Sequence, residues 1–201
     1  PMLRVTAAAE QRGDLLQALR WEEAQPECRR PLIVVEEPFE ERKRYFEAVT
    51  RQVLAGYELL RTAASETGLT LPEVHATTSP EPVVQAVKTA EVAAAALPPS
   101  LDGLTVVLAP ERVRDDASWA ALVAGLLRAA TVLSKTDDAA RPRAVRWLVH
   151  DTSDGALAAA LGEGVEFALD DGALFAWMKK AGEKAPSGAR PGGASGTPGT
   201  R

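Results

Sequence analysis

The sequence lacks the features that mark secreted and membrane-spanning proteins. Its 201 residues contain one cysteine, Cys28, so no disulfide can form within the chain. No apolar run approaches the roughly 20 residues needed to span a bilayer. The first residues also lack the basic stretch, apolar run and cleavage site of a signal peptide. We therefore expect a cytoplasmic protein with no membrane partner.

Positive charge and aromatic side chains are also scarce. Lys and Arg number 23 against 28 Asp and Glu, the net charge is −5, and aromatic residues make up 5% of the chain. Residues 182–201 contain three basic side chains and one acidic side chain, so the rest of the chain carries −7. A body of this charge repels polyanions, and no basic stripe interleaved with aromatics is present. We expect no nucleic-acid partner.

Large apolar side chains are absent from the last twenty residues. Residues 182–201 hold six glycines and three prolines, which cannot offset the entropy lost on folding. We interpret this segment as a disordered tail or linker. The chain as a whole is 46% apolar, which suits a single core, so we assign residues 1–181 to one domain.

Within that domain, short apolar runs alternate with stripes of helical spacing. The runs lie at residues 31–35, 104–109, 144–149 and 165–169, a helix is expected over residues 39–65, and a weaker strand and helix are expected within residues 3–23. Residues 69–77 are predicted to form an edge strand, because Pro72 would delete a ladder hydrogen bond in a central one. The pattern predicts an α/β fold with three layers: a mostly parallel sheet of about five strands, covered by helices on both faces.

Polar residues follow each predicted strand. They are Glu36, Glu111, the pair His150 and Asp151, and Asp170. Because ligands bind beyond the carboxyl ends of parallel strands, these residues are the candidates for a site. Glu36, Asp151 and Asp170 are candidate ligands of a hard cation such as Mg²⁺. Glu111, His150 and Asp151 are candidate catalytic residues, with His150 as a base oriented by Asp151.

A structural interpretation of the same residues stays open. Aspartates between a strand and a helix are typical N-caps, which suits Asp151 and Asp170. His150 is then a solvent-facing loop residue, and His75 and Cys28 carry no function. Trp119 and Trp147 stand in apolar patterns and are expected in the core. On this interpretation the acidic strand ends stabilise helices and bind nothing.

The turn after the first strong strand, in "PLIVVEEPFEERKRYF" at residues 31–46, bears on nucleotide binding. The order of elements over residues 30–180 resembles that of a P-loop NTPase of the STAND class. The stretch "LTVVLAPERV" stands where such proteins carry the Walker B motif, and "RAVRWLVHDT" is similar to their sensor strand. The resemblance implies that residues 36–41 replace the phosphate-binding turn.

That turn departs from the sequence that binds phosphate. A Walker A loop, G-x-x-x-x-G-K-[ST], uses glycines to expose successive N–H groups and a lysine to neutralise the phosphates. Here "EEPFEERK" has no glycine, loses an N–H at Pro38 and carries four carboxylates, while Lys43 lies too far into the helix. At the Walker B position Ala109 and Pro110 stand where an acidic residue is expected, and Glu111 is the only acid nearby. We expect no nucleotide cofactor and no ATP hydrolysis.

Three functional hypotheses follow. The resemblance to inactivated STAND-like domains implies a non-catalytic adaptor in a bacterial signalling or conflict system, with another protein or domain as partner. The acidic strand ends permit a metal-dependent hydrolase or phosphotransferase instead. A structural subunit of a larger assembly is the third hypothesis.

Overall fold

The computed structural model describes residues 2–6, 11–25, 27–135, 144–151 and 166–168. The α/β class predicted from the sequence is confirmed in this part of the chain. The described strands are β1 (Met2–Thr6), β2 (Leu32–Val35), β3 (Gly103–Leu108), β4 (Ala144–Asp151) and β5 (Glu166–Ala168). The described helices are α1 (Arg12–Glu23), α2 (Arg42–Glu66), α3 (Pro82–Ala95) and α4 (Asp116–Lys135). The predicted tail at residues 182–201 lies outside the described residues, as does Asp170.

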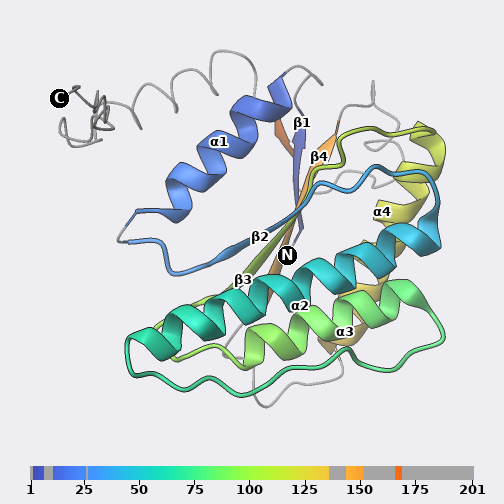
Figure 1. The fold of residues 1–201 in the computed structure, drawn as a ribbon. Coiled ribbons are helices and arrows are strands. Elements are labelled where there is room, and N and C mark those ends of the chain that lie inside the picture. The colour runs from blue at the N-terminus through green and yellow to red at the C-terminus, as the bar shows by residue number, and fades with distance from the viewer. Residues whose placement is uncertain (1, 7–10, 26, 136–143, 152–165, 169–201) are drawn as a thin grey trace, which may run out of the picture.

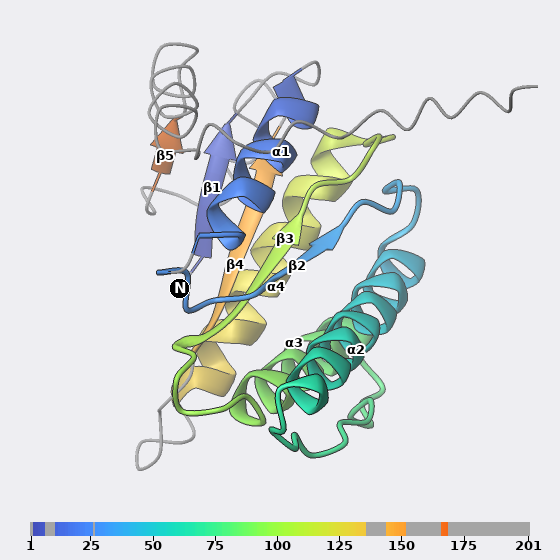
Figure 2. The ribbon, with the colours of Figure 1, turned by 60° about the vertical axis from the view of Figure 1, so that its left-hand side comes forward.

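Strands β2, β3 and β4 are hydrogen-bonded neighbours that run parallel. Val35 pairs with Leu108, and Leu108 pairs with Val149, so the three strands end at the same edge. Pairing continues through β1 to β5, which gives the order β2-β3-β4-β1-β5 (Figures 1 and 2). β2 is therefore an outer strand of the described sheet, although it is the first strong apolar run of the sequence.

The edge strand predicted at residues 69–77 is wrong. This segment connects α2 to α3 and forms neither a strand nor a sheet pairing. Its polar groups bind helices instead: the Tyr57 hydroxyl donates to the Pro72 carbonyl at 2.8 Å, and the Thr77 N–H donates to the Thr89 hydroxyl at 3.1 Å. Extended residues with a strand-like sequence are thus held against α2 and α3.

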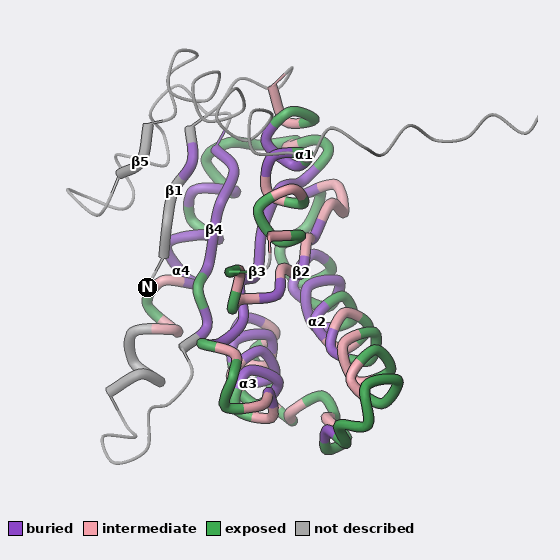
Figure 3. Tube along the Cα trace, turned by 90° about the vertical axis from the view of Figure 1, so that its left-hand side faces the viewer, coloured by how far each residue is buried: buried purple, intermediate pink, exposed green. Residues whose placement is uncertain are grey.

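Apolar side chains form two clusters on the sheet. The larger one joins α2, α3 and α4 to the sheet and includes Val53, Ala90, Leu122 and Val106. The smaller one joins α1 to the sheet and centres on Leu16. Figure 3 shows the buried positions of α2 and α3 on their inner sides and exposed positions on their outer sides.

The expectation of two core tryptophans is confirmed. Trp119 on α4 and Trp147 on β4 are fully buried in the larger cluster. Their burial follows from the sequence pattern, since each stands on the apolar stripe or run of its element. Among the described residues, no helix combines the length and the apolar character needed to cross a membrane.

The second half of α2 lies in close contact with β2. A Cβ atom added at Gly56 would lie 2.8 Å from the side chain of Ile33, which is too close for a real Cβ contact. The missing side chain therefore lets the helix lie directly on the outer strand.

Candidate functional site

The carboxyl edge of β2, β3 and β4 brings three of the predicted site regions together. Glu36 follows β2, Glu111 follows β3, and Asp151 ends β4. The Glu111 N–H donates to the Glu36 carbonyl at 3.0 Å, so the backbones after β2 and β3 lie side by side. The sheet thus places Glu36 and Glu111 on neighbouring backbones.

Two arginines of α1 hold the carboxylate of Glu36. Arg12 donates to one oxygen at 2.7 Å, and Arg20 donates to the other at 3.3 Å. Arg12 also donates through Nε to the Ala109 carbonyl at 3.0 Å, so it ties α1 to the ends of both β2 and β3. Because two guanidinium groups already neutralise this carboxylate, Glu36 is poorly suited to bind a cation.

The turn after β2 is paired at Glu36 and at Phe39 with the segment after β3. Phe39 donates its N–H to the Arg112 carbonyl at 2.8 Å, and its carbonyl accepts the Arg114 N–H at 3.2 Å. A bridge between Phe39 and Val113 continues the parallel pairing. A phosphate-binding nest needs successive N–H groups that point into one concavity. Here the Phe39 N–H is used by the pairing, and Pro38 has none.

An aromatic cluster fills the space between this turn and the first turns of α2 and α4. The ring of Phe39 lies 5.7 Å from that of Tyr45 and 5.3 Å from that of Trp119, and the rings of Tyr45 and Trp119 lie 5.5 Å apart. All three side chains are buried. Burial raises the pKa of the Tyr45 hydroxyl well above its ordinary value. The cluster makes the turn part of the core.

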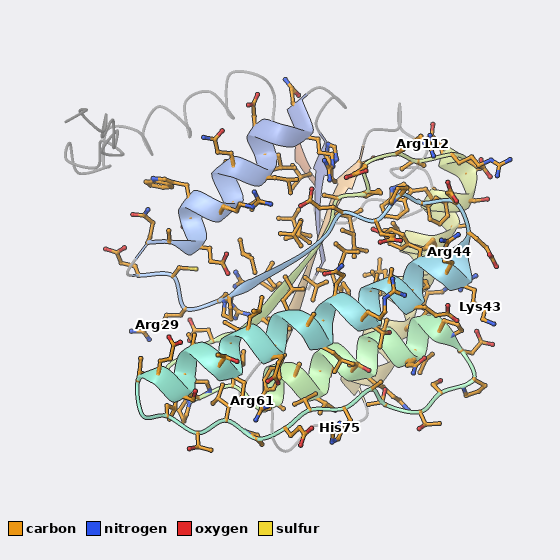
Figure 4. The ribbon with its side chains drawn as sticks, viewed as in Figure 1. Arg29, Lys43, Arg44, Arg61, His75 and Arg112 are labelled. Atoms are coloured by element: carbon orange, nitrogen blue, oxygen red, sulfur yellow. The ribbon has the colours of Figure 1, made fainter. Side chains whose placement is uncertain are left out.

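Charged side chains surround the turn on its solvent side. Arg112 and Glu40 form an ion pair at 3.2 Å between the segments after β3 and β2. Figure 4 shows Arg112, Lys43 and Arg44 at this end of the molecule, with Lys43 and Arg44 on the first turn of α2. Both of these side chains are exposed. Lys43 therefore lies on the helix surface, as its sequence position predicts.

His150 is not the solvent-facing loop residue that the sequence suggested. It lies inside β4, opposite Val5 of β1, and is 1% exposed. Asp151 follows as the last residue of the same strand, opposite Thr6, and is 0% exposed. Both residues have interactions within the chain. The helix that Asp151 was predicted to cap would lie within residues 152–165, which are outside the described residues.

The strand order identifies the place where an open α/β sheet would bind a ligand. The chain leaves β1 for β2 at one edge of the sheet, and leaves β4 for β5 on the other side of β1. The topological switch point therefore lies between β1 and β4. The turn after β2 lies away from it. The residues that follow β1, "TAAAEQRGD" at 6–14, also lack a lysine, and their one glycine, Gly13, belongs to α1.

The metal-dependent enzyme gains no geometric support from the described residues. In that part of the chain, no group of three or more His, Cys, Asp or Glu side chains could hold a metal ion. His75 is exposed and lies 3.8 Å from Glu73, and the half-buried Cys28 thiol donates to the Arg30 carbonyl at 3.4 Å. Metal-dependent chemistry stays a prediction from the sequence alone.

The residues that shape this edge most were not identified from the sequence. Arg12 and Arg20 reach Glu36 across 24 and 16 positions of the chain, a separation that no local spacing rule covers. Phe39 was expected within a helix over residues 39–65, whereas α2 begins at Arg42. Its place between Pro38 and Glu40 gives no apolar periodicity that would indicate burial.

Comparison with known proteins found no similarity on which a family could be assigned. No protein-family model matches the chain, and no curated protein sequence or solved structure is significantly similar to it.

Proposed function

We propose that this chain is a non-catalytic protein–protein interaction module, an adaptor, built on a degenerate nucleotide-binding scaffold. Its partner is another protein or domain. The resemblance of its layout to inactivated STAND-like domains suggests a bacterial signalling or conflict system as its setting. The single observation that carries the proposal is the pairing of Phe39 with Arg112 and Arg114, which closes the turn after β2.

Three physical features of that turn argue against an anionic ligand. Its backbone is committed to pairing with the segment after β3. The ring of Phe39 is buried against Tyr45 and Trp119, so aromatic side chains occupy the space behind the turn. The two cationic side chains nearest the strand end, Arg12 and Arg20, are bound to Glu36. A polyphosphate would have to break these contacts and meet further carboxylates.

The proposal includes the three-layer arrangement predicted from the sequence. The strand order β2-β3-β4-β1-β5 is consistent with a sheet of five parallel strands. The larger cluster, with α2 to α4, and the smaller cluster, with α1, use different side chains of β3: Val106 belongs to the first and Val107 to the second. Since neighbouring residues of a strand point to opposite faces, α1 and α2 to α4 cover opposite faces.

The absence of a nucleotide site is tested by calorimetric titration of the full chain with Mg·ATP and Mg·GTP at moderate salt. The proposal predicts no saturable heat up to a ligand concentration of about 1 mM, which corresponds to a binding free energy weaker than about −4 kcal/mol. Saturable binding with a Kd of about 10 μM or below contradicts it.

The adaptor role is tested by native mass spectrometry of the chain purified gently from its own cells. The proposal predicts a protein that co-purifies in stoichiometric amount, and no bound nucleotide. Recovery of a nucleotide or a metal in stoichiometric amount, with no protein partner, would overturn it.

A further inference from the structure

The outer edge of β2 is a surface that the described fold leaves open. β2 is the first strand in the sheet order, and no other described strand pairs with its outer side. In Figure 1 it lies between α1 and α2, and in Figure 2 it lies at the margin of the sheet. An outer strand with unpaired backbone groups is a template for another strand.

The hydrogen bonds of β2 show which backbone groups point outward. The Pro31 carbonyl accepts the Thr105 N–H at 3.0 Å, and the Val35 carbonyl accepts the Ala109 N–H at 3.0 Å. Because backbone groups alternate in direction along a strand, residues 31, 33 and 35 face β3 and residues 32 and 34 face outward. Leu32 and Val34 therefore present their N–H and C=O groups at the edge.

Opposite charges stand at the two ends of this edge. Arg29 precedes the strand and Glu37 follows it, whereas Glu36 is already paired with Arg12 and Arg20. Arg29 is exposed and Glu37 is partly exposed. When two such edges run antiparallel, the basic end of each faces the acidic end of the other. The charge pattern is therefore complementary to itself only in an antiparallel pair.

We infer that a second copy of this chain docks on β2 by antiparallel pairing of the two outer edges. Leu32 of each copy pairs with Val34 of the other, so two residue pairs each exchange both hydrogen bonds. The same register brings the end of each edge that carries Arg29 next to the end of the other edge that carries Glu37. The contact is an isologous, two-fold interface that extends the sheet across both copies.

Glu23 competes with this pairing. Its carboxylate accepts the outward N–H of Leu32 at 2.7 Å in a solvent-exposed contact. A second copy needs that N–H, so the Glu23 side chain must swing into solvent when the edges pair. A charged group that covers an edge N–H weakens strand addition. Glu23 therefore lowers the affinity of the dimer without blocking it.

The inference goes beyond the proposed adaptor role, because it concerns association between copies of the chain and not a heterologous partner. A failure to dimerise leaves the adaptor proposal intact, and nucleotide binding leaves the dimer intact. The two proposals are therefore separable by experiment.

The first test is sedimentation equilibrium of the full chain over about 1 to 200 μM. We expect a reversible monomer–dimer equilibrium within this range, which spans the weak end of specific association. Val34→Pro should abolish it, because proline removes an outward N–H and none of the bonds to β3. Val34→Ala is the matched control: it truncates the side chain, keeps the N–H, and should still dimerise.

The second test is an exchange of charges, which a folding defect cannot imitate. Arg29→Glu and Glu37→Arg should each weaken the dimer about tenfold, because each places like charges opposite each other. The double variant R29E/E37R should restore the affinity, because the pairs then have opposite sign again. Glu23→Ala should tighten the dimer several-fold. A wild-type chain that stays monomeric to about 200 μM, or a dimer that responds to none of these changes, overturns the inference.

Discussion

Two regions of the described structure are held by different forces. In the larger cluster, which includes side chains of α2, α3 and α4, 27 buried residues are described, and Trp119 and Leu122 of α4 are 0% exposed. In the smaller cluster, which includes side chains of α1, six buried residues are described, and α1 is also joined to the strand ends by Arg12 and Arg20 through Glu36. One sheet is thus stabilised by apolar packing in the larger cluster and by ion pairs between α1 and the carboxyl end of β2.

The ionic attachment explains why the acidic residue after β2 is compatible with a stable fold. Arg12 satisfies both the Glu36 carboxylate and the Ala109 carbonyl, so a cation stands at the strand ends without any bound ligand. In a phosphate-binding site, that positive charge would be available to the ligand. In this chain the guanidinium of Arg12 is bound to Glu36 and Ala109, so its charge is not available to a phosphate. The adaptor proposal depends on this point.

The largest expected effect comes from the larger apolar cluster. Trp119→Ala removes a buried ring from the aromatic cluster and should lower the free energy of unfolding by about 3–5 kcal/mol. Leu16→Ala on α1 should cost about 2 kcal/mol, near the low end for a buried leucine, because the smaller cluster can collapse around the gap. Urea denaturation monitored by circular dichroism measures both. Equal losses would contradict the difference between the two clusters. Leu59→Ala, at a position 73% exposed, is the control and should change little.

Substitution of two glycines by alanine should change the stability of the protein by smaller amounts and in opposite directions. Gly56→Ala forces a Cβ atom against Ile33 and should destabilise the protein by about 1–3 kcal/mol. Gly13→Ala on α1 meets nothing within 4 Å and should stabilise it by about 0.5–1 kcal/mol through helix propensity. Thermal unfolding of the two variants gives shifts of opposite sign. A stabilising Gly56→Ala would show that α2 is not packed tightly on β2.

The smallest expected effect tests the ionic attachment. In a double-mutant cycle with Arg12→Met and Glu36→Gln, the coupling energy should be about 1 kcal/mol, since the pair is only partly buried. The coupling should fall at high salt, because exposed charges are screened. The same cycle with Arg61 and Glu58, an exposed pair on α2, is the control and should give less. No coupling at low salt would show that α1 is held by its apolar contacts alone.

Much of the fold could be predicted from the sequence. The apolar runs at residues 31–35 and 104–109 became β2 and β3 within one residue at either end, because a buried parallel strand needs a continuous apolar stretch. The periodic stripe at 39–65 became α2, although its start was placed three residues early. Local patterns therefore defined the elements.

The order of the strands and the surroundings of the site could not be predicted in this way. Nothing in the local pattern indicates that β1 pairs with β4, because a crossover can span any number of strands. His150 ends a continuous apolar run, which fits either a buried strand residue or the first loop residue; the pairing with Val5 decides for the strand. Arg12 and Glu36 meet only because α1 crosses the sheet.

The most direct test of the closed turn is amide hydrogen exchange at Phe39, measured by NMR with and without Mg·ATP. The account predicts that this amide exchanges slowly, as the amides of Ile33 and Val35 that face β3 also should, because its N–H is bonded to the Arg112 carbonyl. Addition of Mg·ATP should leave its rate unchanged. A rapidly exchanging Phe39 amide that becomes protected when Mg·ATP is added would contradict the account, because it would reveal an open phosphate-binding turn.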